Sequence, residues 1–311
     1  MLGAIAALLL VGALAPAIAG ARVRCTYQDG GLPILPQGNV MSITMDQFDA
    51  LDLRRAGDAI ELRDDSTLGS KIHVSCSGGT PTVTNIDSIV IDASSARSTS
   101  VFINLGGGPL APGATAEPDG TSEIEISVRQ HGSQSDMGIH GSALPDSFRF
   151  GTSGGHPAAN LNAGQEAPAS ADVDLTFTRP GFHDILSGRG NDRISADGGP
   201  GFDGQLGSMQ VGFFAGKGDD VLRGHDAFDW LDGGDGADTI RGLGGRDLIA
   251  GGAGRDLLFG GGGNDVISSR RGSRDRVSCG AGADQAFSDA QDRLSGCERI
   301  FHSPVSFVRA F

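Results

Sequence analysis

The sequence predicts an all-β fold in which short coils stack into a solenoid. A nine-residue unit is repeated six times without interruption over residues 215–268. Each unit has glycine in its first half, an aspartate at its sixth place and an apolar residue at its eighth. A fixed period with these residue types in phase is typical of stacked coils rather than of an ordinary globular domain.

The six units read AGKGDDVLR, GHDAFDWLD, GGDGADTIR, GLGGRDLIA, GGAGRDLLF and GGGGNDVIS. Their sixth-place aspartates are Asp220, Asp229, Asp238, Asp247, Asp256 and Asp265. Their eighth-place apolar residues are Leu222, Leu231, Ile240, Ile249, Leu258 and Ile267. The glycine-rich half of a unit can turn tightly, and the last three residues form a short strand with one inward side chain. Because one unit cannot bury a core alone, neighbouring coils must stack.

The stacked turns point to calcium as the ligand. Aspartates of successive coils would lie at strand spacing, ~4.8 Å, and would repel one another without a positive charge between them. Calcium binds carboxylate and carbonyl oxygens, and a glycine-rich turn can supply both. The alternative is a solenoid that has kept its shape but lost its ions, in which the sixth-place aspartate has no structural use.

This stretch resembles the repeats-in-toxin (RTX) family, also called haemolysin-type calcium-binding repeats, whose nonapeptide is GGxGxDxUx. The resemblance implies a parallel β-roll with two nonapeptides per coil and calcium between turns on the same side. It implies that Asp220, Asp238 and Asp256 share ions along one edge, and that Asp229, Asp247 and Asp265 do so along the other. It further implies that the turn glycines contribute backbone carbonyls and the turn shape, at Gly188, Gly190, Gly216, Gly218, Gly233, Gly234, Gly236, Gly242, Gly244, Gly245, Gly251, Gly252, Gly254, Gly260, Gly261 and Gly263.

Units outside the six depart from the nonapeptide pattern to different degrees. SGRGNDRIS at 187–195 keeps the pattern, so Asp192 joins the six aspartates as a predicted metal ligand. Asp203 is followed by a glutamine at the eighth place, and residues 207–214 then interrupt the register. Asp275 comes one residue late, and the unit of Asp284 has only an alanine at its eighth place. We therefore predict several calcium ions at Asp192 and at the sixth-place aspartates of the six units. We argue against calcium at Asp203, Asp275 and Asp284.

Composition narrows the ligand and the partners. The formal net charge is −14, which argues against nucleic acid as a partner. Residues 181–287 contain many aspartates but no glutamate, so the choice of acid suggests a geometric role. The same stretch is rich in glycine and self-repelling, and we expect metal binding to contribute directly to its folding.

The N-terminus predicts export. Residues 1–21 are read as a Sec-type signal peptide, although no Lys or Arg precedes the apolar run, and a membrane anchor is the alternative. No later stretch could span a membrane, so the mature chain is expected to be extracellular.

Four cysteines in an exported chain suggest two disulfides. Of three possible connectivities we favour Cys25–Cys76 and Cys279–Cys297, and the absence of a CxxC pair argues against zinc.

Residues 22–180 predict an irregular β-rich region. Short β-like runs occur at 59–62, 72–75, 86–91, 101–105, 124–128, 148–150 and 173–177, and residues 45–55 suggest a short helical turn. Worn units at 131–139 and 141–149, with Asp136 and Asp146, favour a solenoid continuous with the roll. A separate β-sandwich is the alternative. The roll itself is placed at 181–287, and 288–311 are read as a C-terminal cap over its open edge.

No catalytic constellation emerges from the sequence. HExxH is absent, and the GxSxG match around Ser153 lacks the helix that a nucleophile elbow needs. We therefore expect a secreted, non-catalytic calcium-binding protein with a structural or adhesive role, whose partners are cell-surface or matrix components. The alternative is a calcium-stabilised extracellular hydrolase or polysaccharide lyase with its site in 22–180.

Overall fold

The computed structural model describes residues 23–28, 39–45, 49–64, 72–94, 99–108, 110, 124–131, 135–161, 174–178, 183–199, 202–271 and 273–302. These residues form two long β-sheets, and their only helical element is a 3₁₀ turn, η1 (Leu105–Gly107). The predicted signal peptide and the last residues of the predicted cap lie outside the described residues. Within the described part of the chain, no helix is long and apolar enough to cross a membrane.

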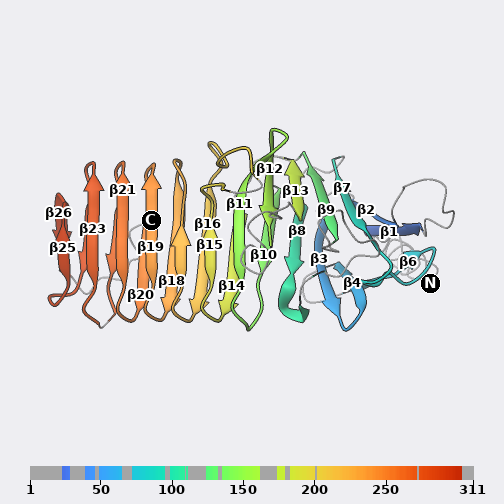
Figure 1. Cartoon of the computed structure of the whole chain (residues 1–311), viewed down its shortest axis with the longest axis horizontal. Helices are drawn as coiled ribbons and strands as arrows, with labels where there is room; N and C mark the ends of the chain where they lie inside the picture. The colour runs from blue at the N-terminus through green and yellow to red at the C-terminus, as the bar shows by residue number, and fades with distance from the viewer. Residues whose placement is uncertain are drawn as a thin grey trace, which may run out of the picture.

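The two sheets run the length of the molecule, with their strands side by side along its long axis (Figure 1). The first sheet, called sheet A, has the spatial order β25 (Arg293–Ser295), β23 (Arg276–Ala281), β21 (Leu257–Gly262), β19 (Thr239–Gly244), β17 (Val221–Arg223), β15 (Arg193–Ser195), β11 (Ser147–Ser153), β12 (His156–Asn160), β13 (Leu175–Thr178), β9 (Glu125–Gln130), β7 (Ser88–Ala93), β2 (Val40–Met45), β1 (Val23–Gln28) and β6 (Cys76–Ser77). The second, sheet B, has the order β26 (Arg299–Phe301), β24 (Gln285–Ser288), β22 (Val266–Ser269), β20 (Leu248–Ala253), β18 (Asp229–Asp235), β16 (Val211–Lys217), β14 (His183–Arg189), β10 (Asp136–His140), β8 (Thr99–Asn104), β3 (Asp49–Ala56), β4 (Ala59–Asp64) and β5 (Ile72–Val74).

Alternate nonapeptides supply alternate sheets. Leu222, Ile240 and Leu258 stand in register on neighbouring parallel strands of sheet A, and all are fully buried. Leu231 and Ile249 do the same in sheet B. Each coil therefore uses two repeats, and the eighth-place aliphatics of both sheets meet in one core. The predicted parallel β-roll is confirmed.

The first half of the chain continues both sheets. Strand β14 pairs in parallel with β10, and β15 pairs in parallel with β11. The irregular part is therefore a solenoid joined to the roll, and the alternative of a separate sandwich is wrong. The irregularity comes from hairpins that insert antiparallel strands, such as β11 with β12 and β3 with β4.

One local prediction fails. Residues 45–55 were expected to include a helical turn, but strand β3 covers most of them and pairs with β8. Leu51 and Leu53 are both fully buried, and their alternation with Asp52 and Arg54 has the period of a strand. The two-residue period decides the local structure because it matches the inward face of the sheet.

Disulfides close the two ends of the solenoid, as predicted. Cys25 of β1 is bonded to Cys76 of β6, its partner in the sheet register. Cys279 of β23 is bonded to Cys297, which lies between β25 and β26.

The GxSxG match is a hairpin. Ser153 ends β11 at a Gly154–Gly155 turn that leads into β12.

Candidate metal centre

The sixth-place aspartates form two rows along the edges of the roll. The first row contains Asp192, Asp220, Asp238, Asp256 and Asp275, in the turns that lead from sheet B to sheet A. The second row contains Asp229, Asp247, Asp265 and Asp284, where the chain returns to sheet B. Every one of these side chains is at most 1% exposed. The structure thus buries the carboxylates that the repeat places in register.

A hydrogen bond connects each aspartate to the next coil of its row. The backbone N–H of Asp220 donates to Oδ1 of Asp238 at 2.8 Å, and the N–H of Asp238 donates to Oδ1 of Asp256 at 2.9 Å. In the second row, the N–H of Asp247 donates to Oδ1 of Asp265 at 2.9 Å. In every row aspartate except Asp229, Oδ1 is therefore fixed by the backbone of the preceding coil.

The second carboxylate oxygen has no such partner. Oδ2 is buried and accepts no hydrogen bond from the described residues in Asp192, Asp220, Asp238, Asp247, Asp256, Asp265 and Asp284. Burying an uncompensated polar oxygen costs roughly 1–3 kcal/mol, and more when it carries charge. A cation bound to a row of such oxygens would therefore compensate this cost.

The raised pKa values of the row aspartates also indicate a need for a cation. Burial raises the pKa of Asp220 and Asp265 to about 6, of Asp238 and Asp275 to about 7, and of Asp247 to about 8. The neighbouring carboxylates of the same row raise these pKa values further, while the backbone hydrogen bonds lower them. Without a cation, the folded rows would take up protons near neutral pH.

First-place glycines leave room beside the unpartnered oxygens. A Cβ on Gly233 would lie within 3.0 Å of both Oδ2 of Asp238 and the carbonyl oxygen of Gly251 in the next coil. Gly242 has the same relation to Asp247 and to the carbonyl of Gly260. A carboxylate oxygen and a carbonyl oxygen thus converge on a space that any side chain would fill.

The remaining predicted turn glycines set the close stacking of the coils. Positive φ angles occur at Gly188, Gly190, Gly216, Gly218, Gly234, Gly236, Gly245, Gly252, Gly254, Gly261 and Gly263. At Gly263, an added Cβ would run into the carbonyl oxygen of Gly245 in the preceding coil. Gly244, at a third place, does not adopt positive φ. Gly251 and Gly260 occupy first places beside the Oδ2 atoms of Asp256 and Asp265.

The donor set suits calcium. Among the described residues, no group of three or more His, Cys, Asp or Glu side chains could hold a metal ion. The oxygens that converge beside the first-place glycines are a carboxylate Oδ2 and a backbone carbonyl, as at Asp238 and Gly251. Calcium accepts such all-oxygen sets in flexible geometry, whereas zinc prefers nitrogen and sulfur.

The rows extend beyond the aspartates that the sequence favoured. The N–H of Asp256 donates to Oδ1 of Asp275 at 2.8 Å, and the N–H of Asp265 donates to Oδ1 of Asp284 at 2.8 Å. One extra residue between Asp265 and Asp275 lengthens both intervals to 19 residues and is absorbed without loss of register, which the nine-residue count could not reveal. Asp203 lies outside the rows, and its Oδ2 accepts a hydrogen bond from the N–H of Gly154.

Side chains also close the rows at their ends. Before the first row, the N–H of Asp146 donates to Oδ1 of Asp192 at 2.8 Å, and the N–H of Ser142 binds Oδ2 of Asp146. After the rows, Asp292 accepts from the N–H of Asp275 and Glu298 accepts from the N–H of Asp284.

The Asp229 turn differs from the others. Its Oδ1 lies 2.8 Å from Nδ1 of His225, and its Oδ2 accepts a 2.8 Å hydrogen bond from the N–H of His225. The imidazole is fully buried. Burial lowers the pKa of His225, but the hydrogen bond and the charge of Asp229 raise it, so that the pKa lies above its ordinary value. Asp229 was predicted as a metal ligand, yet both its oxygens are engaged by one histidine.

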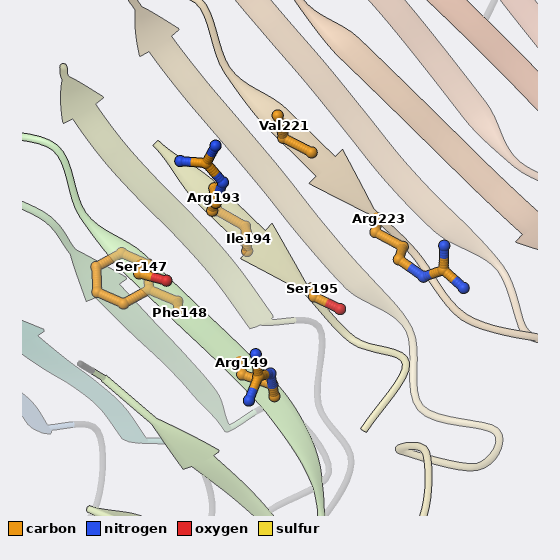
Figure 2. Close-up of a pocket in the computed structure, with 8 residues that line it drawn as sticks. All are labelled: Ser147, Phe148, Arg149, Arg193, Ile194, Ser195, Val221 and Arg223. Atoms are coloured by element: carbon orange, nitrogen blue, oxygen red, sulfur yellow. The ribbon is translucent and has the colours of Figure 1, made fainter. Parts of the chain in front are cut away.

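The outer face of sheet A carries a row of arginines. Figure 2 shows Arg149, Arg193 and Arg223 on the adjacent strands β11, β15 and β17, around a hollow of about 150 Å³. Further along the same face stand Arg241, Arg276 and Arg293. No acidic residue lies among the outward-facing residues of β15, β17, β19, β21, β23 and β25. Arg223 is paired with Asp197, which follows β15, and the other arginines give this face a positive charge in a protein of net charge −14.

Comparison with known proteins agrees with the geometry. Residues 214–249 and 241–274 match the family model described as the RTX calcium-binding nonapeptide repeat. No curated protein and no solved structure matches the chain. The matched stretch covers the four aspartates whose first-place residues are glycine and whose Oδ2 is unpartnered, Asp238, Asp247, Asp256 and Asp265. These residues form RTX repeats within a parallel β-roll.

Proposed function

We propose that this RTX-repeat protein is a secreted, non-catalytic calcium-binding protein whose roll folds when calcium fills the turns. The observation that carries the proposal is the series of buried, unpartnered Oδ2 atoms along both edges. Calcium held there by each carboxylate and by nearby carbonyls compensates the buried charge and joins one coil to the next. Because the unfolded chain has no such sites, the free energy of binding contributes to folding.

We assign calcium first to Asp238, Asp247, Asp256 and Asp265, where the first-place glycine leaves space. At Asp192 and Asp220 the first place holds Ser187 and Ala215 instead of glycine. These two turns keep an unpartnered Oδ2 and are assigned calcium next. Asp284 also keeps an unpartnered Oδ2 and extends the proposed sites beyond those that the sequence favoured.

Export and disulfides support one another in this proposal. The two disulfides fit an oxidising compartment, and extracellular calcium modules can work at millimolar calcium. The cap role of 288–311 is supported by Asp292 and Glu298, which accept the last N–H groups of the two rows.

The arginine face of sheet A supports an adhesive role. Arg149 and Arg193 stand on neighbouring strands, and Arg241 lies over the ring of Phe259 at 4.9 Å from its centroid. Such a surface complements anionic glycans of a cell surface or matrix, because guanidinium groups bind carboxylates in a paired geometry.

A metal count and a folding titration test the proposal together. The full-length mature chain is dialysed against EDTA, and calcium or magnesium is added while far-UV circular dichroism is recorded. Calcium should restore β signal, several ions should bind per chain, and magnesium should do much less because it demands a tighter octahedron. A metal-free protein that keeps the same signal and binds no calcium would overturn the proposal.

A second candidate is a calcium-stabilised hydrolase or lyase. The observation that favours it is a group of titratable residues on β10 and β14. Burial and the charge of Asp136 raise the pKa of Asp184, while His140 lowers it. Paired carboxylates of this kind can act as acid and base on a glycan. A panel of polysaccharides and esters decides the question, because turnover that Asp184→Asn abolishes would replace the non-catalytic role.

A further inference from the structure

The turn at residues 224–229 keeps the backbone frame of a calcium turn. Gly224 stands at its first place, and a Cβ there would meet both Oδ2 of Asp229 and the carbonyl oxygen of Gly242 in the next coil. The N–H of Asp229 also donates to Oδ1 of Asp247 at 3.0 Å, as in the other coils. The frame therefore continues through this turn, and only the surroundings of the carboxylate differ.

The difference lies at the second place. In the other turns this residue has positive φ, as at Gly216, Gly234 and Gly252. His225 does not adopt positive φ, and its N–H is turned toward Oδ2 of Asp229. Side-chain size alone does not cause this, because Leu243 stands at the second place of the next turn along the same edge and keeps φ 80.

Asp229 also begins its row. Within each row, Oδ1 accepts the N–H of the aspartate one coil earlier, as Asp265 accepts that of Asp247. Among the described residues between β15 and β16, 196–199 and 202–210, no aspartate donates its N–H to Asp229, and Asp203 lies outside the rows. Nδ1 of His225 lies 2.8 Å from Oδ1 of Asp229, in the place of the N–H donor that the preceding coil does not supply. The carboxylate is thus satisfied at both oxygens inside its own turn.

We propose that His225 replaces calcium at Asp229, so that the second row binds its first calcium at Asp247. The backbone N–H of His225 engages Oδ2, the oxygen that the other turns leave unpartnered, and its imidazole engages Oδ1. This inference rests on the proposed function. It assigns the start of the second row to hydrogen bonds from a residue of the chain itself, which engage both oxygens of the buried carboxylate without a metal.

Calcium counting on four variants tests the inference. The full mature chain is compared with Asp229→Asn, Asp247→Asn, His225→Gly and Leu243→Gly, each saturated with calcium and freed of excess ions before elemental analysis. Leu243→Gly is the matched control, since it also restores a second-place glycine on the same edge. Far-UV circular dichroism in saturating calcium verifies that each variant is folded.

We expect Asp229→Asn to bind as many ions as the unchanged chain, and Asp247→Asn to bind fewer. His225→Gly should bind one more ion per chain, because it frees both oxygens of Asp229 and restores a glycine, whereas Leu243→Gly should change nothing. Loss of an ion in Asp229→Asn, or an unchanged count in folded His225→Gly, would overturn the inference. If the unchanged chain binds no calcium at all, the proposed function itself fails.

Discussion

The N–H of Asp247 donates a 2.9 Å hydrogen bond to Oδ1 of Asp265 in the next coil, while Oδ2 of Asp265 is buried without a hydrogen-bond partner. Two functions are thus divided between the two oxygens of one carboxylate. Oδ1 fixes the register of successive coils through the backbone, and Oδ2 is left for a cation. The same division recurs at Asp192, Asp220, Asp238, Asp247, Asp256 and Asp284, so register and the proposed metal binding depend on the same side chains.

Stability of the metal-free protein should fall as pH rises. Burial raises the pKa values of five row aspartates from 3.8 to between about 6 and 8, namely Asp220, Asp238, Asp247, Asp265 and Asp275. A folded state that binds more protons than the unfolded state is favoured at low pH, and this advantage is lost as pH rises through the folded-state pKa values. Far-UV circular dichroism in EDTA should therefore show a smaller folded fraction at pH 8 than at pH 5.

Saturating calcium should flatten that pH dependence, because the cation keeps the same carboxylates ionised in the folded state. Calcium binding at pH 7 should accordingly release protons, which titrations in buffers of different ionisation enthalpy would detect. A metal-free protein that is more stable at pH 8 than at pH 5 would contradict the prediction.

Removing the charge of one row carboxylate should weaken the roll in calcium. Asp247→Asn keeps an oxygen that can accept the N–H of Asp229, but it removes the charge beside Gly242. We expect a loss of roughly 1–3 kcal/mol in the free energy of unfolding at saturating calcium, measured by urea denaturation. Asp284→Asn should have a comparable effect because Asp284 belongs to the same row. Asp203→Asn is the control and should change little.

The cost of replacing a turn glycine by alanine should depend on the backbone geometry at that position. Gly263→Ala would place a methyl group against the carbonyl of Gly245 and force a side chain into positive φ. We expect it to cost about 2–4 kcal/mol, measured by thermal unfolding in calcium. The adjacent Gly262→Ala is the matched control, since its φ is not positive and its nearest neighbour would lie 3.9 Å away. Equal effects of the two substitutions would contradict this account of the turns.

The C-terminal disulfide should stabilise the last coils. Cys279 and Cys297 are 18 residues apart, and closing a loop of that size contributes about 3 kcal/mol in the chain-entropy model. The double variant Cys279→Ser and Cys297→Ser should therefore unfold at lower urea concentration in calcium. Hydrogen exchange should locate the loss at β23 to β26, and uniform loss over both ends would argue against a local role.

The arginine face should bind an anionic polysaccharide. Arg149→Ser combined with Arg193→Ser should weaken binding to polygalacturonate about tenfold, because two guanidinium contacts to carboxylates are lost. Surface plasmon resonance with immobilised polymer measures this, and the affinity should fall with added salt. Arg299→Ser, on the outer side of sheet B, is the control. Equal affinity for neutral dextran would exclude a charge-based interaction.

Much of the site could be predicted from the repeat alone. The interval of 18 residues between Asp220 and Asp238 places them one above the other, because a strict period leaves the chain one way to stack its aliphatics. The nine-residue period did not predict the row positions correctly where the spacing changes. Asp275 and Asp284 come one residue late, yet the turns absorb the extra residue and hold both carboxylates in register.

The coil, the row aspartates from Asp220 to Asp265 and their core aliphatics could be read from the chain alone, because they follow from a nine-residue period that the six units keep. The tertiary structure alone decided what surrounds each carboxylate. The sequence predicted the same role for Asp229 and Asp247, but Asp229 is enclosed by His225 while Oδ2 of Asp247 has no hydrogen-bond partner. The physical reason is that satisfaction of a buried charge depends on the direction of one N–H and one imidazole, and the spacing of residues along the chain does not encode that direction.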